Sequence, residues 1–548
     1  MPASSPLAQF LKWEKEIPQD VFLRQPVNGA WKTWTWQQAG NDARRLAAGL
    51  HAQGLQKGDH VAILSKNCAQ WILADLAVMM AGCVSIPIYP TLSAAAINPI
   101  LVHSDSKVII LGKLDDLSKQ SDGIPAGMLR IGVNMYGNTE ALSMEALVAA
   151  HEPMIEVNAW KPDDIFTIIY TSGTTGKSKG VMHCVKAFDT VVPLVVDTLN
   201  MPQRPRLFSY LPISHIAERM STEMYGIYYG ANISFAESLE TFAKNLEATQ
   251  PQLFFAVPRI WSKLREGILK KLPQKKLDLL LSIPLLNTII KKKIHKSLGL
   301  SKATHIYSAA APLSPELQQW FINLGIQLRQ AYGMTEDCVY SHFDSPADFR
   351  VGKAGRALPG LLVKLAADGE LREKSVSNML GYYKEPELTA EAFDEEGYLK
   401  TGDIGEYDAD GFLAITGRIK DLFKTDKGKY IAPAPVEMQL LANTKIEQAC
   451  VVGTGVPQPI ALLTLSDAGM KLPKEELEND LMITLKEVNS KLEAFEKLEK
   501  LVIMKENWTI ENGMLTPTLK VKRNEIEKIN LPAYPAWYHQ KGIIVWQK

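Results

Sequence analysis

The sequence predicts an α/β protein with largely parallel sheets and at least two domains. Helical patterns alternate with short β-branched runs over most of the chain, which is typical of parallel strands joined by helices. Hydrophobic residues make up 46% of the 548 residues and charged residues 22%, as in soluble globular proteins, so a disordered chain is excluded. The length exceeds the roughly 250–300 residues at which one hydrophobic core stops growing, so we expect more than one domain.

The first elements follow this alternation along the chain. They are predicted in the order helix 36–52, strand 61–64, helix 69–81, strand 84–88 and strand 108–111. The apolar stretch from Trp71 to Pro90 is about as long as a membrane span, but Asp75 interrupts it and two prolines close it. We therefore interpret this stretch as a buried α/β element.

Charge and cysteine content exclude several kinds of protein. The 60 basic residues are balanced by 60 acidic ones, so there is no basic excess for binding nucleic acid. The five cysteines include no CxxC pair, which argues against a zinc ribbon or a thioredoxin-type site and favours a reducing compartment. The N-terminus lacks a basic segment followed by an apolar one, so we expect no secretory signal and a cytoplasmic location.

One segment is strongly basic. From Lys263 to Lys296 there are ten lysines or arginines against two acids, around an apolar run at 279–290 that is too short to span a bilayer. Two interpretations stay open: peripheral contact with the anionic inner surface of a membrane, or a solvated helical hairpin that caps the large domain. The oligomeric state is open too, a homodimer included.

Two later segments bear on the domain organisation. Residues 474–505 alternate Glu and Lys with apolar residues, which predicts an amphipathic helix and a neighbouring one. The Gly- and Asp-rich residues 397–411 are interpreted as turns. The best domain boundary lies just after them, within residues 417–421.

The strongest local signal is YTSGTTGKSKG at residues 170–180. It follows a strand-like run at 165–170 and precedes a helical pattern that begins near Val181. Glycines let the backbone approach an anion, and the N–H groups and hydroxyls donate to phosphate oxygens. The P-loop pattern fails by one residue because Thr171 stands where its first glycine is required, which argues against a P-loop NTPase or kinase. A different phosphate cradle is predicted.

This loop resembles the signature of the adenylate-forming (ANL) superfamily, with Ser178 where most members carry proline. Further stretches match that family's motifs in the family's order: QAYGMTE at 330–336, YLKTGDIG at 398–405, GRIKD at 417–421 and LTPTLKVKR at 515–523. The resemblance covers roughly residues 30 to 530. Within the superfamily, SYLPISHIAERM at 209–220, the hinge run at 417–433 and the tail at 511–523 look most like long-chain fatty acyl-CoA synthetases.

The resemblance implies a large N-terminal domain, residues 1–419, that binds AMP and the acyl group, and a small mobile α+β domain, residues 420–548. It implies activation of a long-chain fatty acid by ATP through an acyl-adenylate, then transfer to coenzyme A, with AMP and pyrophosphate released. ATP, Mg²⁺ and coenzyme A would take part. The alternatives are a ligase for another carboxylate or with a carrier-protein acceptor, and a non-catalytic fatty-acid-binding protein on the same fold.

The resemblance also assigns roles to single residues. Lys520 would be catalytic, contacting the carboxylate and the α-phosphate, and His215 would lie beside the acyl pocket. Tyr332 would stack on adenine, Thr335 would reach the α-phosphate, and Asp403 would accept hydrogen bonds from the ribose hydroxyls.

The remaining expected site residues surround the phosphates and the hinge. Thr171 and Glu336 would hold Mg²⁺, Arg418 and Lys424 would contact the nucleotide, and Lys420 lies at the hinge. Ala310 stands in SAAAP, where many members carry a glycine that lines the adenine, and its small side chain keeps the backbone accessible. The nucleotide-binding set is completed by Ser172, Gly173, Thr174, Thr175, Gly176, Lys177, Gln330 and Ala331.

Overall fold

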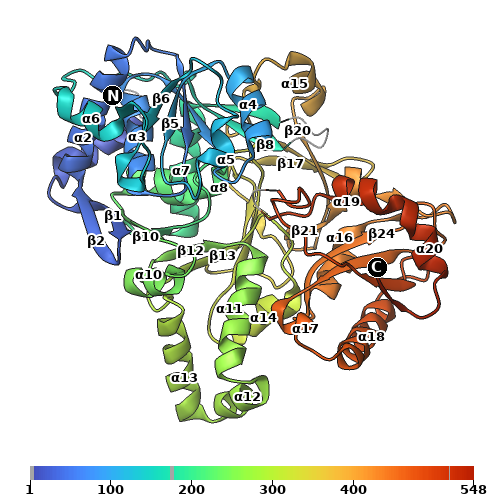
Figure 1. Ribbon diagram of the computed structural model, residues 1–548. Coiled ribbons are helices and arrows are strands. Elements are labelled where there is room, and N and C mark those ends of the chain that lie inside the picture. Colours follow the sequence, from blue (N-terminus) through green and yellow to red (C-terminus); the bar gives the residue numbers. More distant parts are fainter. Residues whose placement is uncertain (1–4, 173–177, 517–518, 548) are drawn as a thin grey trace.

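The computed structural model describes residues 5–172, 178–516 and 519–547. A large part with several sheets and surrounding helices carries the N-terminus, and a smaller C-terminal part, orange to red in Figure 1, lies at its side. This arrangement confirms the predicted α/β class with a large N-terminal and a smaller C-terminal domain. All five cysteines lie in described segments, and each is a free, buried thiol.

An eight-stranded sheet forms the centre of the large part, in the order β19-β9-β8-β4-β3-β5-β6-β7. Neighbouring strands from β8 to β7 run parallel, whereas β8, β9 and β19 pair antiparallel. Apolar runs such as VAIL form the central strands because both faces of the sheet are covered. The strands are β3 (His60–Leu64), β4 (Val84–Ile88), β5 (Ser106–Leu111), β6 (Leu129–Gly132), β7 (Leu142–Ser143), β8 (Ile165–Ser172), β9 (Ser178–Cys184) and β19 (Gly381–Tyr382).

The apolar stretch from Trp71 to Pro90 is the buried α/β element that the sequence predicts. It forms α3 (Ala69–Met80), in which every residue is buried, and strand β4. Asp75 on α3 is fully buried, and its carboxylate lies 2.6 Å from the guanidinium of Arg219. Within the described segments, no helix is both long and apolar enough to cross a membrane.

Three smaller sheets complete the large part. One has the order β10-β11-β1-β2, one β12-β13-β14-β15-β16 and one β17-β18-β20-β21. Their strands are β1 (Val21–Val27), β2 (Ala30–Thr35), β10 (Arg206–Ser209), β11 (Asn232–Phe235), β12 (Leu253–Ala256), β13 (His305–Ser308), β14 (Arg329–Tyr332), β15 (His342–Phe343), β16 (Arg356–Ala357), β17 (Leu362–Leu365), β18 (Glu370–Lys374), β20 (Leu399–Tyr407) and β21 (Leu413–Arg418).

The C-terminal part has its own four-stranded sheet with apolar residues on both faces. Adjacent residues of β25 point to opposite sides: Leu463 packs with Leu481 in one cluster, and Leu462 packs with Tyr534 in another. Helices therefore cover both faces. The elements are β24 (Ile446–Val452), β25 (Ile460–Leu465), β26 (Lys500–Ile503), β27 (Ile544–Trp546), α16 (Pro433–Leu440), α18 (Lys474–Ser490), α19 (Arg523–Asn530) and α20 (Tyr534–His539).

The basic segment forms three helices that project from the large part (Figure 1). They are α11 (Pro258–Lys271), α12 (Gln274–Ser282) and α13 (Pro284–Ser297). The apolar run at 279–290 does not form one helix, because Pro284 begins a new helix and cannot continue the preceding one. A helical hairpin is therefore present.

Three sequence interpretations were wrong in detail. Residues 181–184 continue strand β9 and the helix, α7 (Val185–Leu199), begins only after them, because Val181 and Met182 pair with β8 across an antiparallel hairpin. Residues 397–411 are mostly strand β20, in which Gly405 packs closely against Leu413 of β21 whereas Gly402 has open space around it. After α18, the charged segment 474–505 ends in strand β26 and not in a second helix.

The remaining elements connect these layers. They are α1 (Pro6–Glu16), α2 (Trp36–Ala52), α4 (Ala94–His103), α5 (Ser118–Ser121), α6 (Met144–Ala150), α8 (Ile216–Glu218), the π-helix η2 (Arg219–Met224), α9 (Tyr225–Tyr229), α10 (Phe242–Thr249), α14 (Pro315–Asn323), α15 (Pro386–Ala392), α17 (Asp467–Met470), β22 (Phe423–Lys424), β23 (Tyr430–Ile431) and the 3₁₀ turns η1 (Asn134–Tyr136), η3 (Ile419–Asp421) and η4 (Leu531–Ala533).

Candidate active site

Asp403, in the middle of β20, is the centre of a polar cluster with the last residues of β14 and β21. It lies on β20 directly opposite Arg418 on β21, and the guanidinium donates to its carboxylate. The hydroxyl of Tyr332, at the end of β14, donates to the same carboxylate over 2.6 Å. The charge of Asp403 raises the pKa of Arg418. The pKa of Tyr332 is raised mainly by burial and, to a smaller extent, by the charge of Asp403. The buried carboxylate of Asp403 thus accepts hydrogen bonds from two side chains and can accept from a further donor.

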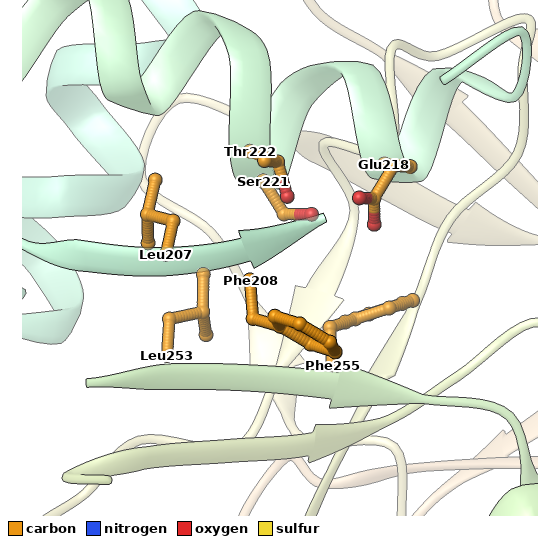
Figure 2. Close-up of a pocket in the computed structure, with 7 residues that line it drawn as sticks. All are labelled: Leu207, Phe208, Glu218, Ser221, Thr222, Leu253 and Phe255. Carbon is orange, nitrogen blue, oxygen red and sulfur yellow. The ribbon is translucent and has the colours of Figure 1, made fainter. Parts of the chain in front are cut away.

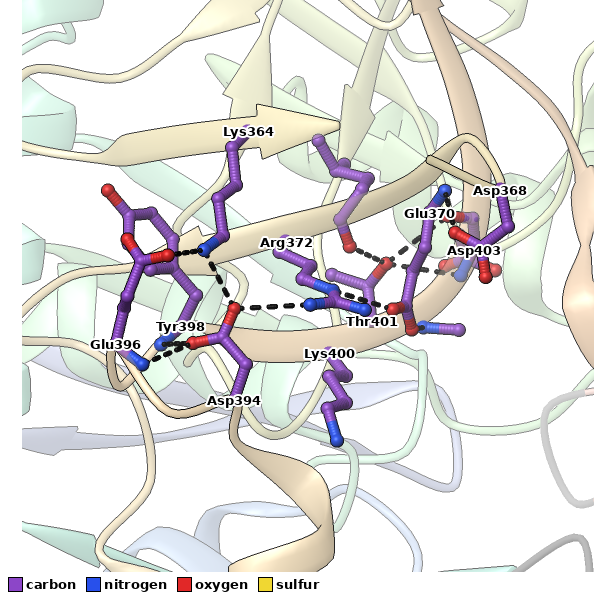
Figure 3. Close-up of polar contacts among 12 residues, drawn as sticks. Lys364, Asp368, Glu370, Arg372, Asp394, Glu396, Tyr398, Lys400, Thr401 and Asp403 are labelled. Atoms are coloured by element: carbon purple, nitrogen blue, oxygen red, sulfur yellow. Dashed lines mark hydrogen bonds and ion pairs between the residues drawn. The ribbon is translucent and has the colours of Figure 1, made fainter. Parts of the chain in front are cut away.

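A network of ion pairs supports the turn that precedes Asp403 (Figure 3). Arg372 on β18 lies 3.2 Å from Asp394 and 2.8 Å from Glu370. Glu370 in turn accepts a hydrogen bond of 3.1 Å from the backbone N–H of Gly402. Gly402 has a φ of 71°, which a residue with a side chain adopts only under strain. The network therefore fixes the backbone that aims Asp403.

Glu336 follows β14 and is held from the eight-stranded sheet. The hydroxyl of Tyr382, on β19, donates to its carboxylate over 2.9 Å. The ammonium of Lys179, on β9, lies 4.7 Å from the Tyr382 ring centre, and Lys179 pairs across the hairpin with Thr171 on β8. Through Tyr382 and Lys179, this chain of contacts links Glu336 to Thr171 on the paired strands β8 and β9. These are the two residues expected to hold Mg²⁺.

The donor set around Glu336 fits a magnesium ion that is only partly held by protein. One carboxylate oxygen of Glu336 accepts from Tyr382, which leaves the second oxygen for another partner. Across the described residues, no group of three or more His, Cys, Asp or Glu side chains could form a complete metal cage. Mg²⁺ prefers few protein ligands with waters and phosphates making up the rest, so this arrangement suits it.

The phosphate loop itself joins β8 to β9. The two strands pair antiparallel up to Ser172 and Ser178. Five expected phosphate ligands, Gly173, Thr174, Thr175, Gly176 and Lys177, lie outside the described residues.

Lys520 comes from the C-terminal part and reaches the same cluster. Its backbone N–H donates to the Thr516 hydroxyl over 3.0 Å, and Leu515 and Val521 pair across the loop base. Desolvation lowers the pKa of Lys520 to about 8, with a further lowering by Arg418 and an opposing effect of Asp403 and Glu336. The residue as a whole is exposed, so solvent screens part of this effect.

His215 is a neutral side chain near Lys520. Its Nδ1 accepts a hydrogen bond of 3.1 Å from the N–H of Ala217 at the start of α8. Burial and, to a smaller extent, the charge of Lys520 lower the pKa of His215 to about 3. Because Nδ1 accepts, Nε2 carries the proton in the neutral ring and is the donor.

Glu218 was missed by the sequence reasoning, which singled out only the histidine of its motif. It is buried, and it accepts from the Ser209 hydroxyl over 2.9 Å and from the Tyr210 N–H over 3.2 Å. Burial raises the pKa of Glu218 to about 8. Its carboxyl faces a cavity of about 10 Å³ (Figure 2), lined also by Leu207, Phe208, Ser221, Thr222, Leu253 and Phe255.

This cavity has room for about one water molecule. Ligand pockets for small molecules are typically about 300 Å³ or larger, so the space beside Glu218 does not hold an acyl chain. The signal for Glu218 in the sequence was only its place three residues after His215. Its burial depends on the packing of α8 against β10, which a sequence pattern does not specify.

The expected adenine-side residues lie along β13 and β14. Gln330 pairs with Ser308, and its N–H donates to Asp344 over 2.8 Å. Ala331 and Thr335 are both buried near the same strand end. Ala310 has a φ of 70°, the left-handed conformation that favours glycine, so its backbone keeps a glycine-like geometry.

Two expected residues lie at the start of the C-terminal part. Lys420 is in η3, immediately after β21, and Lys424 ends β22. The ammonium of Lys424 lies 5.6 Å from the ring centre of Tyr430. The structure thus brings Tyr332, Asp403, Arg418, Glu336, His215 and Lys520 into one region, and places Lys420 and Lys424 at the connection beside it.

The family comparisons agree with this geometry. Residues 10–383 match the model of the AMP-binding enzyme family, and residues 420–529 match that of the AMP-binding enzyme C-terminal domain. A relative from Mycobacterium bovis, named long-chain-fatty-acid–CoA ligase FadD15, is 29% identical over 95% of this chain and 94% of its own length.

Solved structures show the same fold at lower identity. The adenylation domain of a carboxylate reductase from Mycobacterium chelonae aligns with a TM-score of 0.82 at 22% identity, over 98% of this chain and 92% of that one. The o-succinylbenzoate coenzyme A synthetase from Bacillus subtilis, in complex with AMP, aligns with a TM-score of 0.73 at 22% identity, over 95% and 98%. Because the family model matches well over half of the chain, the protein belongs to the AMP-binding enzyme family of the adenylate-forming (ANL) superfamily.

Proposed function

We propose that the chain is a long-chain fatty acid–CoA ligase that converts a fatty acid, ATP and coenzyme A into acyl-CoA, AMP and pyrophosphate. One observation carries the proposal: Lys520, from the C-terminal part, lies close enough to Asp403 and Glu336, from the large part, for their charges to act on its pKa. The name of the Mycobacterium bovis relative, which aligns over nearly its full length, supports a long-chain fatty acid as the acyl substrate. The neutral chain and its free cysteines fit the cytoplasmic location that we propose.

In the first step, an oxygen of the fatty acid carboxylate attacks the α-phosphorus of ATP, and the bond from this phosphorus to pyrophosphate breaks. Both reactants are anions, so the step needs positive charge close by. Lys520 would supply it at the carboxylate and the α-phosphate, and Asp403 would hold the ribose hydroxyls. Mg²⁺, held by Thr171 and Glu336, would supply further positive charge and act as a Lewis acid when bound.

In the second step, the coenzyme A sulfur attacks the acyl carbon, the bond to the AMP oxygen breaks, and AMP leaves. The proton of the thiol passes to solvent water, because Nδ1 of the nearby His215 already accepts a hydrogen bond and its Nε2 carries a proton that it can only donate. For this step the C-terminal part would move about the boundary between residues 419 and 420. Its two apolar clusters contain only residues from Phe423 onward, which supports movement as a separate body.

A substrate panel tests the proposal. Pyrophosphate and AMP release is measured with palmitate, a short-chain acid and an aryl acid, each with and without coenzyme A. We expect palmitate to give the highest kcat/KM and acyl-CoA to form only when coenzyme A is present. A preference for the aryl acid, ADP as the product, or acyl transfer to a carrier protein in place of coenzyme A would contradict the proposal.

A further inference from the structure

The helices α11, α12 and α13 form an arm that extends away from the sheets (Figure 1). Helix α11 begins two residues after β12, and α13 returns toward α10, so the base of the arm is attached at both ends. The far end consists of α12 and the first turns of α13. At about 1.5 Å per residue, the 14 residues of α11 span roughly 20 Å, and at its far end the first residue of α12, Gln274, accepts a hydrogen bond of 2.9 Å from Trp320 of α14.

The far end exposes large apolar side chains. Leu285 is 81% exposed, Leu279 63% and Ile289 59%, and Ile283 and Leu286 are exposed as well. These five are a dense group, because they all lie within eleven residues of the chain. Large apolar side chains that gather at one exposed end of a folded protein favour an interaction site there.

These side chains are not needed for the core of the arm. Ile268, Leu277 and Ile294 point inward and pack with Leu324, next to α14. The arm therefore has an inner apolar face that is buried against Leu324. A second group of apolar side chains is exposed at its tip. We call Leu279, Ile283, Leu285, Leu286 and Ile289 the apolar tip.

Unpaired positive charge surrounds the apolar tip. The arm carries nine lysines between Lys263 and Lys296, against the two acids Glu266 and Asp278. Among the described residues, none of these lysines has its ammonium within 4.0 Å of a carboxylate; Lys263 and Lys270 act at longer range on Glu266, and nine lysines against two acids leave the arm positive.

The order of residues along α13 is that of a membrane-surface anchor. Leu285 and Ile289 come first, and Lys291, Lys292 and Lys293 follow toward the body. Seven residues separate Leu285 from Lys292, or about 10 Å of helix. An interfacial helix buries its apolar residues about 5–10 Å into the headgroup and acyl boundary, with lysines at the level of anionic headgroups.

We propose that the apolar tip and its lysines form a docking surface for an anionic lipid bilayer. Charge complementarity selects this occupant over a second copy of the chain, because two arms meeting tip to tip would bring two sets of lysines together. Contact is peripheral, since α12 and α13 are too short to span a bilayer. The proposal concerns lipid binding alone and does not depend on the ligase activity.

Co-sedimentation of the full chain with vesicles tests the docking surface. Vesicles of phosphatidylcholine with 30 mol% phosphatidylserine are compared with pure phosphatidylcholine, at low and high salt. We expect binding to the anionic vesicles that is at least about tenfold tighter than to the neutral ones and weakens as salt rises. Equal binding to both vesicles, or none to either, would overturn the proposal.

Two variants locate the surface. Replacing Lys291, Lys292 and Lys293 by Glu, or Leu285 and Ile289 by Asp, is expected to lower the vesicle affinity at least about tenfold. All five side chains lie outside the inner core of the arm, and circular dichroism checks that the variants fold. If the arm instead mediated self-association, sedimentation velocity without lipid would show a dimer that the Asp variant dissociates, which would also overturn the proposal.

Matched controls distinguish a loss of binding through this surface from a general effect of lower net charge or of one fewer exposed apolar side chain. Lys471, Lys486 and Lys497, exposed on the C-terminal part, give the same change of net charge when replaced by Glu. Ile155 is 98% exposed and lies outside the arm, so Ile155→Asp is the control for the apolar tip. We expect both controls to bind as the wild type does, and a loss equal to that of the arm variants would contradict a located surface.

Discussion

The hydroxyl of Tyr332 donates a 2.6 Å hydrogen bond to the carboxylate of Asp403, and Arg418 reaches the same carboxylate from the adjacent strand. The three side chains come from two different sheets, so the pairing fixes the sheets relative to each other at the proposed nucleotide site. A carboxylate has about four acceptor positions, and the three hydrogen bonds from Arg418 and Tyr332 leave capacity for a further donor such as a ribose hydroxyl.

Asp403→Ala is expected to raise the KM for ATP roughly 10- to 100-fold, because hydrogen bonds to a charged acceptor contribute about 1.5–3 kcal/mol. Steady-state kinetics with ATP and 2′-deoxy-ATP measures the effect. The wild type should prefer ATP, and the variant should lose this preference. An unchanged preference in Asp403→Ala would mean that another residue holds the ribose. Tyr332→Phe, which keeps the ring, should change the KM for ATP by only a few-fold.

The pKa of Lys520 predicts an alkaline limb in the pH profile. Because this pKa is lowered to about 8, the ammonium form prevails below pH 8 and is lost above it. The kcat/KM for adenylate formation, which reports the free enzyme, should therefore fall above about pH 8. Lys520→Arg keeps a positive charge at all pH values that are tested, so its residual activity should lack this limb. An identical limb in Lys520→Arg would assign the titration to another group.

Ala310→Gly is expected to stabilise the protein by up to about 1 kcal/mol, because Ala310 holds a left-handed φ of 70° that glycine adopts without strain. Urea unfolding of the two proteins measures the difference. The neighbouring Ala309 is the matched control: its φ is not positive, so Ala309→Gly should be neutral or destabilising. Stabilisation by both changes, or by Ala309→Gly alone, would refute the strain at Ala310.

Glu218 predicts a pH dependence of stability. Its pKa is raised to about 8 in the folded protein from a value near 4.5, so the folded state keeps a proton that the unfolded state releases. Its contribution to stability is fully present below about pH 4.5 and is lost as the pH rises through 8. Glu218→Gln should therefore gain stability relative to the wild type between pH 5 and pH 8.

Urea unfolding at several pH values measures this gain. Glu247→Gln, on the exposed face of α10, is the control and should show no pH-dependent difference. A constant difference between Glu218→Gln and the wild type from pH 5 to pH 8 would contradict the buried, protonated state of Glu218.

Motifs with a fixed order of residues could be identified in the sequence, because their pattern depends on residue types and spacing, and the roles assigned to their residues stay predictions. Tyr332, Asp403, Arg418 and Lys520 stand far apart in the sequence, and the fold brings them to one region. The loop at 170–180 was correctly placed after a strand, but the strand that follows it was missed. A helix-like pattern at Val181 is overridden by pairing with β8, which is a tertiary interaction.

Residues whose role depends only on packing were not predictable. Tyr382 reaches Glu336 because β19, a strand of two residues, joins the edge of the large sheet beside β9. Arg219 is fully buried between two carboxylates, Asp75 and Glu223, although a surface position is the usual expectation for arginine. No local pattern marks the contacts of Tyr382 with Glu336 or of Arg219 with Asp75, whose partners are 46 and 144 residues apart, whereas Glu223 lies only four residues after Arg219.

Separate assays of the two half-reactions in Lys520→Ala test the central claim most directly. Adenylate formation is measured by pyrophosphate release without coenzyme A, and thioester formation by acyl-CoA production from supplied acyl-adenylate. A charge interaction of roughly 4 kcal/mol corresponds to about a thousandfold, so the first rate should fall by that order while the second stays close to the wild type. Lys522→Ala, two residues away, should leave both rates unchanged. Equal loss of both half-reactions in Lys520→Ala would contradict the role of this lysine in adenylation.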